Sequence, residues 1–70
     1  MAVKNELGAL MDKRRITEEK LAGLTGMRQG HINLIKNSKR IPQIETALRI
    51  ARALRVPVEK IWSLSDRNAA

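Results

Sequence analysis

Side-chain amides recur along one short segment of the sequence, and they are the residues best suited to chemistry. Gln29, Asn33 and Asn37 are spaced four residues apart, so a helix would place them on one face, with Gly30 beside them. The opposite face would be apolar, because isoleucines fill it. A helix held on one side and presenting amides on the other suits the donor and acceptor edges of a DNA major groove.

Each residue on this face has a functional and a plain interpretation. Gln29 is the strongest candidate for pairing with adenine, although it could be a solvated surface residue, and Asn33 could do the same chemistry one turn later. Gly30 permits close approach of the helix backbone to DNA, or it occupies a tolerant position. Leu34 could pack on a thymine methyl group or simply be exposed. We expect base contacts from Arg28, Gln29, Gly30, Asn33 and Leu34.

A basic turn follows this segment and predicts contacts of a second kind. Cations there would bind phosphates, which fixes the register of the protein on DNA without reading sequence. Any single lysine could instead be a solvated charge, and for His31 we favour a partly buried packing role. The expected phosphate contacts are Thr17, Lys36, Asn37, Ser38, Lys39, Arg40 and Gln43. Arg28, at the mouth of the groove, could add to them.

Helical periodicity predicts the elements that would position these residues. Residues 3–14 have apolar side chains at i, i+4, i+7 and i+8, which is typical of an amphipathic helix. Thr17 is a good N-cap for a second helix. That helix should end at Gly26, where glycine turns sharply without strain. The third helix, which carries the amides, should run from about Arg28 to Asn37.

Two prolines mark the remaining elements. Pro42 precedes a fourth helix, from about Gln43 to Leu54, and Pro57 starts a short fifth helix that ends near Leu64. The inward stripe of the fourth helix is expected to contain Ile44, Ala47, Leu48, Ile50, Ala51 and Leu54. No strand pattern is evident. The sequence predicts an all-α, compact five-helix domain over residues 1–64, with a flexible C-terminal tail at 65–70.

Composition bounds the function. The 70 residues suit one small domain, and the net charge of +7, with a pI near 10.9, favours polyanionic partners. Without cysteine and with one histidine, we expect no metal site and no cofactor. A single aromatic residue, Trp62, gives no stacking platform for single strands. No nucleophile–base pair or carboxylate pair suggests an enzyme. Lacking a long apolar run or signal peptide, the chain is expected to be cytoplasmic and nucleoid-associated, away from membranes.

Five ordered pieces of the sequence resemble the Cro and phage-repressor type of helix-turn-helix domain, the xenobiotic-response-element-like (XRE) family. They are Leu10–Arg15 leading into Ile16–Thr17, Leu21–Ala22, Gly26–Met27, Ile32–Lys39 and Pro42–Trp62. The resemblance extends from about Val3 to Leu64. It implies a five-helix bundle of the lambda-repressor-like type that binds double-stranded operator DNA, usually as a homodimer on a near-palindromic site. Such a protein regulates transcription, most simply as a repressor.

The chain also departs from the family pattern. Glu18 stands where the family usually has a glutamine that touches a phosphate, and Arg28 replaces a common capping serine or threonine. Leu34 occupies the place of a polar or basic residue. Ser38 and Arg55 replace glycines, and neither is expected to alter the topology.

Two other functions remain open. An antitoxin-like module of the same fold would bind a partner protein and autoregulate its operon, and exposed leucines would favour it. The candidate protein contacts are Leu24, Trp62 and Leu64. Nonspecific nucleoid or RNA binding would depend on the charge alone, with a steep loss of affinity as salt rises.

Overall fold

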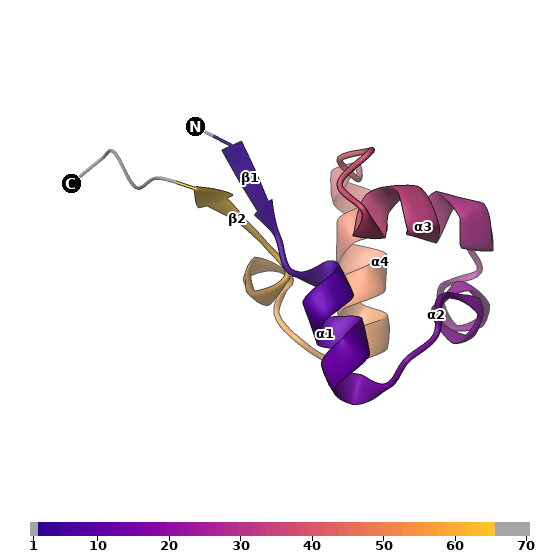
Figure 1. Cartoon of the computed structure of the whole chain (residues 1–70). Coiled ribbons are helices and arrows are strands. Elements are labelled where there is room, and N and C mark those ends of the chain that lie inside the picture. Colours follow the sequence, from indigo (N-terminus) through magenta and orange to yellow (C-terminus); the bar gives the residue numbers. More distant parts are fainter. Residues whose placement is uncertain (1, 66–70) are drawn as a thin grey trace.

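The computed structural model describes residues 2–65 of the chain and contains four α-helices and a small sheet (Figure 1). The elements are β1 (Ala2–Asn5), α1 (Leu7–Arg14), α2 (Glu18–Thr25), α3 (Gln29–Lys36), α4 (Ile44–Leu54), the 3-10 turn η1 (Val58–Lys60) and β2 (Trp62–Ser65). The predicted tail begins at Ser65, which ends β2, and its other residues lie outside the described part. Within residues 2–65, no helix is long and apolar enough to cross a membrane.

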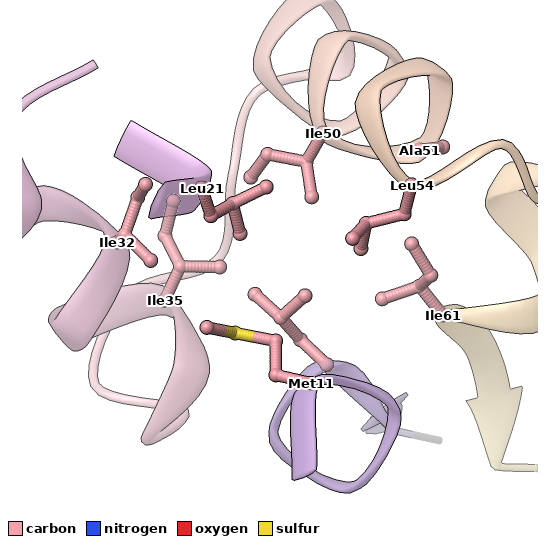
Figure 2. Close-up of a cluster of buried hydrophobic side chains, with 9 residues drawn as sticks. Met11, Leu21, Ile32, Ile35, Ile50, Ala51, Leu54 and Ile61 are labelled. Atoms are coloured by element: carbon pink, nitrogen blue, oxygen red, sulfur yellow. The ribbon is translucent and has the colours of Figure 1, made fainter. Parts of the chain in front are cut away.

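One apolar core holds the helices together. Figure 2 shows side chains from all four helices and from Ile61 converging on it. Its buried members are Leu7, Met11, Leu21, Ile32, Ile35, Ile50, Ala51, Leu54 and Ile61. Full burial of a leucine or isoleucine side chain contributes about 1.5–3 kcal/mol relative to exposure. Ile32 and Ile35, on the inner face of α3, belong to this core and hold the helix in place.

The predicted capping of α2 is confirmed. The Thr17 hydroxyl accepts a hydrogen bond from the backbone N–H of Lys20 at 3.1 Å. Gly26 ends the helix with φ 73°, and its N–H donates to the carbonyl of Ala22. Thr25 is buried, and its hydroxyl donates back into the helix. This turn sets the angle at which α3 leaves α2.

The prediction of a helix over residues 3–14 was wrong for its first residues. Residues 2–5 form strand β1, and α1 begins at Leu7. The side chain of Asn5, which precedes the helix, accepts a hydrogen bond from the N–H of Leu7 at 2.9 Å. This bond satisfies the N–H of the first residue of α1. Val3 has helical spacing to Leu7, but pairing with a distant strand decides its conformation.

The predicted fifth helix was also wrong. After Pro57 the chain makes only the η1 turn and then forms β2, which pairs antiparallel with β1 in the register Val3↔Leu64 and Asn5↔Trp62. Apolar residues two apart, at 62 and 64, suit the alternation of a strand. The architecture is therefore four helices with a two-stranded ribbon, which Figure 1 shows projecting away from α2 and α3.

The inward stripe predicted for α4 was too wide. The positions Ala47, Ile50, Ala51 and Leu54 are buried, as expected. Ile44 is 71% exposed and Leu48 49% exposed. The buried positions span about 100° of the helix circumference, with Ile44 at the edge of that arc and Leu48 beyond it.

Three residues other than glycine take the left-handed conformation where a helix or turn ends. The φ angles are 56° at Arg15, 60° at Ser38 and 60° at Arg55. This conformation costs about 1–2 kcal/mol for a residue with a Cβ. Ser38 and Arg55, which stand at glycine positions of the family pattern, thus adopt the left-handed conformation that glycine favours.

Candidate nucleic-acid interface

The outer face of α3 presents the residues that the sequence analysis selected. Ile32 and Ile35 are fully buried against the core, which fixes the rotation of the helix about its axis. The opposite, exposed side carries the predicted base-contact residues Gln29, Gly30, Asn33 and Leu34, with Arg28 exposed just before the helix. Leu34 is 39% exposed. His31 is half-buried, which agrees with the predicted partial burial.

The start of α3 lacks a side-chain cap. Arg28 occupies the N-cap position without a capping hydrogen bond, as its departure from the family pattern predicts. A serine or threonine there would satisfy one backbone N–H and add about 1 kcal/mol. Instead, a cationic side chain stands at the end of the helix where unpaired N–H groups already favour anions.

A carboxylate from α2 lies against the edge of this face. Glu18 Oε2 accepts a hydrogen bond from Asn33 Nδ2 at 3.0 Å and pairs with Lys36 Nζ at 2.8 Å. The side chain of Glu18 is 18% exposed and that of Lys36 is 29% exposed. Asn33 and Lys36, both predicted to contact DNA, are therefore already bonded to Oε2 of Glu18.

These contacts change the acidity of both charged groups. The hydrogen bond from Lys36, with a second from Asn33, lowers the pKa of Glu18 below its ordinary value of 4.5. The same contact raises the pKa of Lys36 above its ordinary value of 10.5. Because the pKa of Glu18 is lower in the folded chain, its stabilising contribution is present above pH 4.5 and disappears as pH falls through the lowered value.

Asn5 supports the other end of α3, and the sequence analysis missed it. Its Nδ2 donates to the carbonyl of Ile35 at 2.7 Å and to Ser38 Oγ at 3.2 Å. Ile35 is in the last turn of α3, where helix carbonyls lack partners within the helix, and its carbonyl also accepts from the N–H of Ser38. Asn5 therefore fixes the turn that follows the helix. An asparagine before an apolar run is a weak signal, and nothing local indicates a contact 30 residues away.

The basic turn after α3 is ordered by backbone bonds and leaves its cations exposed. The N–H of Lys39 donates to the carbonyl of Leu34 at 2.8 Å, and that of Ser38 to Ile35 at 3.1 Å. Within residues 2–65, no carboxylate pairs with Arg28, Lys39 or Arg40. The other predicted phosphate contacts, at Thr17, Asn37 and Gln43, are also exposed. The Gln43 side chain does not cap α4.

The candidate protein contacts lie on elements other than α3. Leu24 is exposed on α2, and Leu64 is exposed on β2. Trp62 is half-buried and packs on the core. It also lines a hollow of about 270 Å³ with Val3 and Pro42.

A match to a protein-family model identifies the family of this chain. The model HTH_3, described as helix-turn-helix, matches residues 7–61. The chain belongs to the Cro/C1-type (XRE) helix-turn-helix family. No curated protein matches this helix-turn-helix chain. The family consists of DNA-binding transcription regulators and is generally non-enzymatic. The matched residues include α2, the turn at Gly26 and α3 with its exposed amide face.

Proposed function

We propose that this helix-turn-helix protein binds double-stranded DNA sequence-specifically and acts as a transcriptional repressor by occupying an operator. The observation that carries the proposal is the two-sided character of α3. Its inner isoleucines are fully buried, while its outer face presents amides beside cations that no carboxylate of residues 2–65 neutralises. A rigid helix with exposed amides suits insertion into a major groove.

The two kinds of contact come from different parts of the site. Gln29 and Asn33 would pair with base edges, and Leu34 would pack on a thymine methyl group. Lys39 and Arg40 would bind phosphates at the C-terminal side of α3, and Arg28 would do so at its N-terminal side. The exposed Thr17, Asn37, Ser38 and Gln43 would add uncharged phosphate contacts. A cytoplasmic, nucleoid-associated location agrees with this function.

The operator is expected to be near-palindromic and bound by two copies of the chain. Two α3 helices would then occupy successive major grooves, about 34 Å apart. Large apolar side chains are exposed at Ile41, Ile44 and Leu64, and an interface between two copies would remove some of this apolar surface from water.

Selection from a random pool of double-stranded DNA tests the proposal. Bound fragments are sequenced after rounds at several salt concentrations, and the affinity of the enriched sequence is compared with that of a scrambled one. Enrichment of a short two-fold-symmetric motif, bound by two chains in sedimentation, is the expected result. Equal, salt-sensitive binding to every sequence would contradict it and favour nonspecific binding.

Gly30 provides a sharper test of how α3 approaches DNA. A Cβ at Gly30 would meet no atom within 4 Å, so Gly30→Ala should stabilise the free protein by up to about 1 kcal/mol through helix propensity. The added methyl group would nevertheless lie on the groove-facing surface. We therefore expect thermal melting to rise and operator affinity, measured by fluorescence anisotropy, to fall.

Gly23 is the matched control for this substitution. It lies on α2, is exposed, and a Cβ there also meets nothing within 4 Å. Gly23→Ala should give a similar gain in stability and leave operator affinity unchanged. If Gly30→Ala also leaves affinity unchanged, Gly30 occupies a tolerant position and its backbone does not approach DNA closely.

The antitoxin-like alternative would use Leu24, which is exposed in the last turn of α2, just before Gly26. A partner protein that protects Leu24 and neutralises a toxic activity would favour this function. Such a partner is compatible with operator binding, so the DNA selection remains the first experiment.

A further inference from the structure

A negative charge beside a surface proposed to meet phosphates requires an explanation. Glu18 begins α2, and its carboxylate reaches across to α3. Its ion-pair partner is Lys36, and the side-chain amide of Asn33 donates to it at 3.0 Å. A carboxylate in this position repels phosphates, so its presence lowers the affinity for any DNA.

The carboxylate also selects the orientation of an amide. An ionised carboxylate only accepts hydrogen bonds, whereas the two ends of an asparagine amide differ, one donating and one accepting. Because Nδ2 of Asn33 donates to Glu18, the nitrogen end of the amide is held on the side of α2. Among the hydrogen bonds of residues 2–65 its Oδ1 has no partner, and an amide nitrogen has a second N–H to donate. These are the two groups that pair with N6 and N7 of adenine.

The ion pair with Glu18 also occupies the ammonium group of Lys36. Its Nζ lies 2.8 Å from Glu18 Oε2, and its side chain is more than two-thirds covered. For Lys36 to bind a phosphate, it would have to leave this carboxylate and expose the negative charge to DNA. Lys36 is therefore better described as the counter-ion of Glu18 than as a phosphate contact.

We infer that Glu18 is a positioning residue for base reading, which orients the Asn33 amide for adenine and withholds Lys36 from the phosphates. It thereby lowers affinity for all sequences and increases the preference for one base pair. This inference rests on the proposed function. It concerns a residue at which the family pattern has an uncharged glutamine, so it describes what this chain does differently.

Two substitutions separate the two effects. Glu18→Gln keeps an oxygen that can accept from Asn33 but removes the charge, so Lys36 becomes free. All sequences should bind more tightly, and the slope of log affinity against log salt should steepen by about one. The preference for adenine under Asn33 should remain. Glu18→Ala should steepen the slope equally and reduce that preference by roughly fivefold to a hundredfold.

Glu19 is the matched control, because it is the neighbouring carboxylate on the same turn. It is exposed, and within residues 2–65 it has no ion-pair or side-chain hydrogen-bond partner. Glu19→Gln and Glu19→Ala remove the same charge. They should tighten binding slightly through the longer-range field, with the salt slope and the base preference unchanged.

The affinities are measured by fluorescence anisotropy on the selected operator and on versions changed at single base pairs. Slopes and preferences that are the same in the Glu18 and Glu19 variants would overturn the inference. A wild-type protein with no base preference would overturn the proposed function as well. A wild-type preference that Glu18→Ala leaves intact would overturn this inference alone.

A second readout requires no DNA. In NMR spectra of the free protein, the side-chain amide signals of Asn33 should shift on Glu18→Ala and stay in place on Glu19→Ala. The pKa of Lys36 should fall toward 10.5 in both Glu18 variants. Unshifted amide signals would show that the contact does not orient Asn33, whatever DNA the protein binds.

Discussion

Ile50→Ala should lower the free energy of unfolding by about 2–5 kcal/mol, because it removes a fully buried side chain from the centre of the core. A chain of this length has a total stability of roughly 3.5–10 kcal/mol. The substitution should therefore remove a large share of it and leave part of the protein unfolded. Urea denaturation followed by circular dichroism, with Trp62 fluorescence as a second probe, measures the loss.

Ile44→Ala provides the comparison within the same helix. Ile44 is 71% exposed in α4, so the same change should alter stability by less than about 0.5 kcal/mol. Equal losses in dilute protein would contradict the burial pattern. A loss at Ile44 that appears only as protein concentration rises would indicate that a second copy covers this side chain.

Gln29→Ala should reduce discrimination at one base pair of the operator by about 1–3 kcal/mol. The amide of Gln29 is exposed in the first turn of α3, where it can reach a base edge. At every other operator position, a changed base pair should weaken binding of Gln29→Ala as much as it weakens binding of the wild type. Only one position should therefore lose its base preference. Anisotropy titrations against a set of single-base-pair variants measure this pattern.

Lys39→Ala is the control that separates base recognition from electrostatic attraction to phosphates. Lys39 lies in the exposed turn after α3, and a phosphate contact there would release counterions. Its removal should weaken binding to all sequences alike and reduce the salt slope by about one. If Gln29→Ala shows this same uniform loss, then Gln29 does not read a base.

Local signals were sufficient to predict the helix-turn-helix. Thr17 caps α2 through its own side chain, Gly26 supplies the positive φ of the turn, and Ile32 and Ile35 set the inner face of α3. Each of these features depends on residues within a few positions of one another. The placement of the candidate base contacts on one exposed face follows from them, which is why it could be predicted.

The features that were missed depend on distant partners. Val3 is equally compatible with a helix or a strand, and only pairing with Leu64 decides between them. Ile44 lies at the edge of the buried arc of α4, and only the packing of other elements decides that it is exposed. Glu18 was recognised as unusual, but its bonds to α3 require the crossing of two helices. Helical periodicity contains none of this information.

The β1–β2 ribbon bears on the order in which the chain folds. Its register joins Ala2 to Ser65, and closing a loop of that length in an unfolded chain costs on the order of 3–4 kcal/mol in entropy. Once Leu7 and Ile61 have entered the core, the N–H of Glu6 lies 2.8 Å from the carbonyl of Ile61, and most of that cost has been met. The ribbon should therefore close after the helices dock and open before they separate, so that the helix-turn-helix survives excursions in which the two strands come apart.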